Sequence, residues 1–124
     1  NRTEAKAKKI KKRYKNIIYK KEVNRGLIKE AGLIINTTCL GMIGYPSLNL
    51  NLKGVNKEAI IYDIVYNPVD TKFILNAKKE KLPFINGLDM FIEQARCSFD
   101  IWFNIKPKIG QSLYKKIKEE IKKL

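Results

Sequence analysis

Hydrophobic positions along this chain form two kinds of pattern, which are short continuous runs and longer stretches with a helical period. The continuous runs lie at residues 32–37, 59–65 and 83–86. Runs of this length are typical of strands that are covered on both faces, as in a parallel sheet. A further run at 16–23 carries β-branched and aromatic residues and is also expected to form a strand.

Helical periodicity marks the segments around these runs. Helices are expected at residues 4–15, 70–81, 87–103 and 109–124, with a short helix or turn at 24–31. In the helix at 70–81, Phe73, Ile74 and Ala77 form the apolar face, and Asp70 is the expected N-cap. Strands that alternate with helices in this way predict an α/β fold with a parallel sheet.

The helix at 87–103 carries two apolar strips, where a surface helix needs only one. The first strip consists of Leu88, Phe91, Ile92, Ala95, Phe99, Trp102 and Phe103. The second consists of Met90, Gln94, Cys97 and Ile101, so the amide of Gln94 lies one turn from the thioether of Met90. One interpretation puts Met90 in the core and Gln94 at its rim. The other is that this strip faces a ligand.

Length and composition exclude several classes of function. The chain has 124 residues, enough for one domain at most. It has no histidine, which excludes Ser-His and Cys-His catalysis and histidine zinc sites within it. Cys39 and Cys97 lack metal-ligand spacing, which favours a reducing, cytoplasmic setting without a bound metal. We expect no membrane span, because no apolar run reaches about eighteen residues.

The formal net charge of +14 raises the question of a nucleic-acid partner. The excess is nearly all lysine, with lysine runs near both ends of the chain. No aromatic-basic stacking pattern, helix-turn-helix signature or zinc knuckle accompanies this charge. A solvated lysine-rich surface is the simpler interpretation, and a basic nucleic-acid-binding module is the less favoured alternative.

The start of the helix at 4–15 combines the features of an anion site. Thr3 is the expected N-cap, and Arg2 and Lys6 add two cations beside it. Backbone N–H groups and the positive end of the helix dipole attract anions at such a position. Lysine in a first turn is electrostatically unfavourable, which suggests an anion for it to meet. A merely basic helix start is the other interpretation.

Four motifs resemble those of one enzyme family. G-L-D-M-F-I-E-Q-A from Gly87, followed by F-x-x-W from Phe99, resembles the last conserved block of shikimate dehydrogenase. Asn1-Arg2-Thr3, I-N-T-T-C-L-G-M at 35–42 and Y-D-I-V-Y-N-P at 62–68 resemble further family motifs, in family order. The resemblance covers residues 1 to 107 and only the cofactor-binding part of a family member. It implies NADPH-dependent reduction of 3-dehydroshikimate to shikimate in aromatic amino-acid biosynthesis.

The resemblance also implies a fold and a domain plan. We expect an α/β, Rossmann-like three-layer parallel sheet that is incomplete, because the first strand and the glycine-rich phosphate loop are missing. Without that strand the sheet would have a hole between two of its strands. Residues 1–106 would belong to the NADP-binding domain, and 107–124 would form an amphipathic helix that packs back on the enzyme. We therefore expect a fragment, inactive alone, whose partner is the N-terminal substrate domain.

Site residues follow from the resemblance. The expected NADP-binding residues are Asn1, Arg2, Thr3, Lys6, Thr37, Thr38, Ile64, Gly87 and Met90. Tyr66 and Gln94 match substrate contacts, in which the phenol reaches the carboxylate of shikimate and the amide reaches a ring hydroxyl. No catalytic residue is expected in this chain, because the family's catalytic Lys and Asp lie upstream. A quinate-specific or non-catalytic paralogue stays open as an alternative, and the complete enzyme could form a homodimer.

Overall fold

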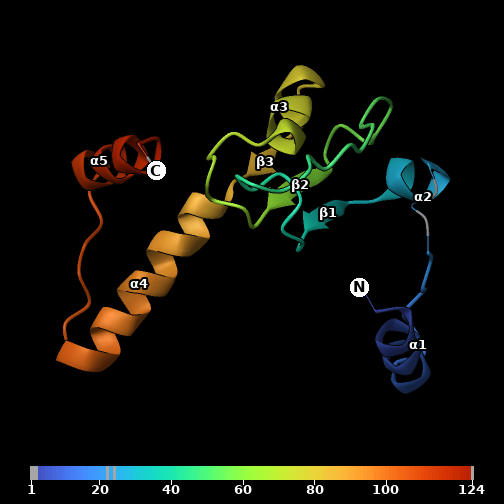
Figure 1. Ribbon diagram of the computed structural model, residues 1–124, viewed down its shortest axis with the longest axis horizontal. Helices are drawn as coiled ribbons and strands as arrows, with labels where there is room; N and C mark the ends of the chain where they lie inside the picture. Colours follow the sequence, from blue (N-terminus) through green and yellow to red (C-terminus); the bar gives the residue numbers. More distant parts are fainter. Residues whose placement is uncertain (1–2, 22, 24, 124) are drawn as a thin grey trace.

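The computed structural model describes residues 3–21, 23 and 25–123 (Figure 1). Its elements are α1 (Glu4–Arg13), α2 (Arg25–Glu30), β1 (Leu33–Asn36), β2 (Ile60–Asp63), α3 (Lys72–Lys79), β3 (Phe84–Ile85), α4 (Gly87–Phe103) and α5 (Gln111–Ile121). All five expected helices are present, and α4 has the predicted bounds. No helix among the described residues has the length and apolar character needed to cross a membrane.

The three described strands form one parallel sheet in the order β1-β2-β3. Ile35 is in register with Tyr62, and Tyr62 with Ile85. The α/β parallel class is therefore confirmed. The expected hole is not found, because the strands described here are direct neighbours.

The expected strand at 16–23 is wrong for its described residues, 16–21 and 23, which form turns and irregular backbone. Its apolar side chains remain in solvent, with Ile18 69% and Val23 68% exposed. A strand is stabilised by its neighbours in a sheet, and β-propensity alone does not maintain one.

The hydrophobic core lies on one face of the sheet, beneath α3. Ile61 points into it from β2 and meets Phe73 and Ala77 of α3. The other buried members of this cluster are Ile28, Leu52, Val55, Ala59 and Leu82. On the opposite face Leu33, Ile35, Ile60 and Ile85 are 38% to 53% exposed. Within the described chain, helical cover is thus concentrated on one side of the sheet, although the apolar runs predicted cover on both.

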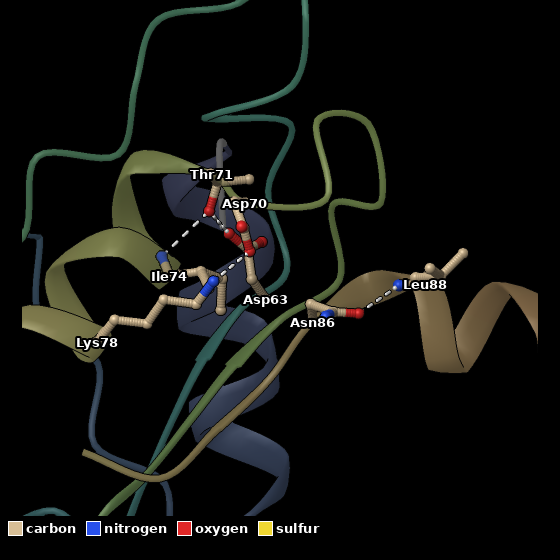
Figure 2. A network of polar contacts seen from close by, with 7 residues as sticks. All are labelled: Asp63, Asp70, Thr71, Ile74, Lys78, Asn86 and Leu88. Atoms are coloured by element: carbon tan, nitrogen blue, oxygen red, sulfur yellow. Dashed lines mark hydrogen bonds and ion pairs between the residues drawn. The ribbon is translucent and has the colours of Figure 1, made fainter. Parts of the chain in front are cut away.

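The N-cap of α3 is Thr71 and not Asp70, which corrects the sequence-based expectation. The Thr71 hydroxyl accepts a hydrogen bond from the Ile74 N–H at 3.2 Å (Figure 2). Asp70 instead forms an ion pair with Lys78 on the surface of the helix, with its Oδ1 2.7 Å from Nζ. Thr71 is buried and Asp70 is exposed, so the residue that caps the helix also joins the interior.

Helix α4 begins at the sheet and ends away from it (Figure 1). The Asn86 side chain caps its first turn by accepting from the Leu88 N–H at 3.1 Å. Leu88 and Ile92 pack against α5 in a second cluster, whose other buried members are Val69 and Ile121. The far end of the predicted apolar face stays in solvent, with Trp102 74% exposed.

Candidate functional site

A buried hydrogen-bond network joins the carboxyl ends of β1 and β2. The Asn36 side-chain N–H donates to Asp63 Oδ1 at 3.0 Å. The Thr71 hydroxyl donates to Asp63 Oδ2 at 2.6 Å, and the Val65 N–H donates to Oδ1 at 3.1 Å. Asn36, Asp63 and Thr71 are at most 4% exposed. Because ligands of parallel α/β sheets bind beyond these strand ends, the network underlies the expected site.

Asn36 also fixes the loop that follows β1. Its Oδ1 accepts from the Thr38 N–H at 3.1 Å and from the Thr38 hydroxyl at 2.7 Å. Its Nδ2 donates a second hydrogen bond to the Leu40 carbonyl oxygen at 2.9 Å. Thr37 and Thr38, the two expected cofactor contacts in this loop, are both exposed. The loop is therefore anchored from beneath while its outer surface is open.

The start of α4 lies directly against the end of β2. The Gly87 N–H donates to the Val65 carbonyl oxygen at 3.3 Å. A Cβ at Gly87 would stand 2.3 Å from the Ile64 carbonyl oxygen, a distance that no side chain tolerates. The structure thus brings together Ile64 and Gly87, two of the predicted cofactor contacts, through their backbones.

Met90 and Gln94 line one open cavity of about 750 Å³, as expected for residues one turn apart on a helix. Its remaining lining residues are Tyr62, Asp89, Glu93, Cys97 and Ser98. Met90 is half-buried and Gln94 is exposed. The second apolar strip of α4 therefore faces a space, and Tyr62 from the open face of the sheet contributes to the same lining.

Tyr66 does not reach this cavity. Its ring stacks on Phe91, with centroids 4.7 Å apart and an angle of 19° between the ring planes. Phe91 follows Met90 by one residue, so it lies about 100° around the helix from it. The structure therefore separates Tyr66 from Gln94, although sequence comparison predicts that both contact the substrate.

Thr3 and Lys6, two of the predicted adenosine-phosphate residues, lie at the start of α1. Asn1 and Arg2 fall outside the described residues. Thr3 has the extended backbone of an N-cap residue, its carbonyl oxygen accepts from the Ala7 N–H at 3.2 Å, and Lys6 is exposed. Helix α1 lies on the other side of the molecule from α4 (Figure 1). The structure does not bring Thr3 and Lys6 close to Met90 and Gln94.

The pKa of Tyr114 in α5 depends on residues at the start of α4. Burial raises the pKa of the Tyr114 phenol above its ordinary value, and the negative charge of Asp89 raises it further. Asn86 opposes this shift by stabilising the charged form. The neutral phenol is therefore the form that the folded protein favours.

Among the described residues, no cluster of His, Cys, Asp and Glu side chains could hold a metal ion.

The sequence-based site did not include Asn36, Asp63 or Thr71. A signal was present for two of them, because Asn36 and Asp63 are polar residues inside otherwise apolar strand runs. Such residues end up buried and must then find hydrogen-bond partners.

Comparison with known proteins identifies similar chains. The sequence profile of the shikimate 5'-dehydrogenase C-terminal domain matches residues 87–111. Shikimate dehydrogenase (NADP(+)) of Rhodospirillum rubrum is 40% identical over 83 residues, which cover 67% of this chain and 29% of that protein. The chain spans about a third of the length of such curated relatives, from 29% of the R. rubrum protein to 40% of the Pelagibacter ubique protein.

Solved structures agree in fold. Shikimate dehydrogenase from Aquifex aeolicus superposes with a TM-score of 0.71 at 25% identity, over 94% of this chain and 41% of that one. Shikimate 5-dehydrogenase from Thermus thermophilus, solved in complex with NADP(H) and shikimate, gives a TM-score of 0.62 at 26% identity. That match covers 82% of this chain and 37% of the other.

Proposed function

Because the chain belongs to the shikimate dehydrogenase family, we propose that it forms the cofactor-binding part of an NADP-dependent shikimate dehydrogenase. The full-length enzyme reduces 3-dehydroshikimate to shikimate in aromatic amino-acid biosynthesis. The observation that carries this proposal is the meeting of the β2 end with the start of α4 at Gly87. In parallel α/β sheets, this edge is where dinucleotides bind.

The residues at this edge fit NADP. Gly87 has no side chain, which lets the start of α4 lie directly against the backbone at the end of β2. We infer that the backbones of Ile64 and Gly87 meet the carboxamide of the nicotinamide. Bound NADPH supplies the hydride. The residues of this chain bind the cofactor and orient it.

Met90 and Gln94, on one face of α4, are assigned to the cofactor and to the substrate respectively. The Met90 thioether is flexible and polarizable, which suits packing against the nicotinamide ring. The Gln94 amide, one turn further, can donate to or accept from a ring hydroxyl of the substrate. Their shared cavity supports this arrangement. Tyr66, whose ring stacks on Phe91 of the same helix, is assigned to the shikimate carboxylate.

The adenosine end of NADP is assigned to the segment that opens α1. Arg2 and Lys6 would pair with the 2′-phosphate, and Asn1 and Thr3 would complete the clamp. Thr37 and Thr38 have exposed positions from which to contact the cofactor. We infer the upstream substrate domain as the partner of this chain, a cytoplasmic setting, and a homodimer of the full-length protein, which sedimentation would test.

The experiment uses the purified full-length protein that carries this segment. Shikimate oxidation is followed by NADPH absorbance, and kcat/KM is compared for NADP with shikimate, NAD with shikimate, and NADP with quinate. We expect NADP with shikimate to give the highest kcat/KM. Equal use of quinate would indicate the quinate paralogue, and a folded protein without turnover would indicate a non-catalytic one. Either result would overturn the proposal.

A further inference from the structure

We propose that Asn36 and Asp63 are a pair of positioning residues that fix the loop after β1 in its place relative to the end of β2. Through this loop they set the place of the NADP nicotinamide. This inference rests on the proposed function and adds to it two residues that do not touch the cofactor themselves.

Burying this polar pair costs desolvation free energy, which a positioning role would explain. Asp63 is fully buried and Asn36 is 4% exposed, so both have lost their contact with water. Within the part of the chain that the structure describes, no buried side-chain nitrogen or oxygen is left without a hydrogen bond. An apolar pair of similar size would fill the same space without such an exacting set of partners. What the polar pair adds is direction, since each hydrogen bond fixes the orientation of a particular backbone segment.

The hydrogen bonds connect the segments that the proposed site uses. The Asn36 amide holds the backbone of Thr38 and Leu40 on one side and Asp63 on the other. Asp63 holds the N–H of Val65, and the Val65 carbonyl oxygen accepts from the Gly87 N–H. A continuous chain of contacts therefore runs from the loop after β1 to the start of α4.

A single substitution breaks the link without removing atoms. Asn36→Asp replaces the bridging N–H donor by a carboxyl oxygen, which would face Asp63 Oδ1 across the 3.0 Å of the present hydrogen bond. Two carboxylates at this distance cannot both be ionised, so one of them takes up a proton at a raised pKa. Around the pair lie the Thr38 and Val65 backbone, the Leu40 carbonyl oxygen and Thr71. Asp70, the neighbour of Thr71, forms an ion pair with Lys78 (Figure 2).

Two matched variants accompany it. Asn56→Asp adds the same charge at the other end of β2, where the Asn56 side chain is exposed and accepts from the Glu58 N–H at 3.1 Å. Leu82→Ala removes buried atoms from the core cluster just before β3, where Leu82 is 4% exposed. It therefore lowers stability while it preserves the hydrogen bonds between the two strand ends.

In the full-length protein, kcat and the KM for NADP are measured between about pH 5 and 8, at temperatures well below each variant's Tm. Asn36→Asp is expected to lower kcat/KM for NADP by about tenfold or more near neutral pH, because a small displacement of bound groups has large effects on rate. The ratio of variant to wild type should rise as the pH falls, because the protonated carboxyl can donate across the gap. Asn56→Asp should match wild type, and Leu82→Ala should lower Tm with kcat/KM little changed.

A ratio of variant to wild type that stays near one at every pH would overturn the positioning role. So would Leu82→Ala changing kcat/KM as much as Asn36→Asp, because the kinetic loss would then follow lost stability and not the broken hydrogen bond between the strand ends. A wild-type protein without NADP-dependent turnover would count against the proposed function. In that case the same variants can be compared by NADP binding, and unchanged affinity across them would overturn the inference separately.

Discussion

The Gly87 Cα lies so close to the end of β2 that a Cβ built on it would stand 2.3 Å from the Ile64 carbonyl oxygen. The Val65 carbonyl oxygen would be only 2.5 Å away. Both obstacles are backbone atoms, so they cannot move aside as the end of a flexible side chain could. Glycine is therefore required here for close approach, without any need for an unusual φ angle.

Gly87→Ala should accordingly destabilise the protein strongly, by about 2 kcal/mol or more, because the junction between β3 and α4 must shift. The free energy of unfolding from urea titration measures this. Gly32→Ala is the matched control, since nothing lies within 4 Å of a Cβ at Gly32. Equal stability of the two variants would show that the contact relaxes without cost.

Continuous apolar runs and helical periodicity identified β1 to β3 and α1 to α5, since these signals reflect burial directly. The run at 16–23 has the same local chemistry, but pairing depends on a neighbouring strand and not on the run itself. The N-cap of α3 was misplaced by one residue for a similar reason. Asp70 and Thr71 are both good caps, and the hydrogen bond of Thr71 to Asp63 is a tertiary contact.

The part of the candidate site that could be predicted is the part where helix geometry alone determines which side chains lie together. Met90 and Gln94 share a cavity because four residues make about one helical turn. The place of Tyr66 depends on which face of α4 packs toward the end of β2, and spacing does not determine that. Asn36 and Asp63 lie 27 residues apart in the sequence, so the hydrogen bond between them becomes visible only when the strands are paired.

The Tyr66–Phe91 stack gives Phe91 a testable role. Phe91→Ala should cost about 1 kcal/mol of stability, the usual contribution of an aromatic pair, and should free the Tyr66 ring. If Tyr66 contacts substrate, the KM for shikimate should rise while the KM for NADP stays unchanged. Phe99→Ala is the control, because Phe99 pairs with Phe103 further along α4. Identical kinetics for the two variants would contradict the role.

Tyr114 should make stability depend on alkaline pH. Its pKa in the folded protein is raised above the ordinary 10.0, first by burial and then by Asp89. The folded state therefore holds the proton at pH values where the unfolded state has lost it, and stability falls as pH rises through this window. Tyr114→Phe should show a shallower fall above pH 10.0, measured by urea unfolding against wild type. Identical dependence of stability on pH in the variant and the wild type would contradict the role of Tyr114.

Arg2 should decide the choice of cofactor. An NAD site needs an acidic residue to hold the ribose hydroxyls, whereas the corresponding segment of this chain carries Arg2, Thr3 and Lys6. Charge-assisted hydrogen bonds to a phosphate are about twice as strong as neutral ones. In the full-length protein, Arg2→Ala should therefore lower kcat/KM for NADP and leave that for NAD unchanged. Lys9→Ala, in α1, is the control, and an equal loss with both cofactors would refute the assignment.

Gln94 separates substrate binding from cofactor binding. If its amide bonds a shikimate hydroxyl, Gln94→Ala leaves that hydroxyl unpaired in the complex, at a cost of about 1–3 kcal/mol in kcat/KM. The dissociation constant for NADP should be nearly unchanged, because the proposed contact to the cofactor is made one turn earlier, by Met90. Met90→Ala should instead lower kcat, since a loosely packed ring is less often in position for hydride transfer.

Gln111→Ala provides the matched control for Gln94, because Gln111 is an exposed glutamine at the start of α5 and does not line the cavity. Its kinetic constants should equal those of wild type. Isothermal titration with NADP and steady-state kinetics with shikimate then give two independent readouts for each variant. If Gln94→Ala weakened NADP binding by the same factor as it lowered kcat/KM for shikimate, Gln94 would be assigned to the cofactor. One that changes neither would leave Gln94 as a surface residue beside a packed Met90, and the cavity would need another occupant.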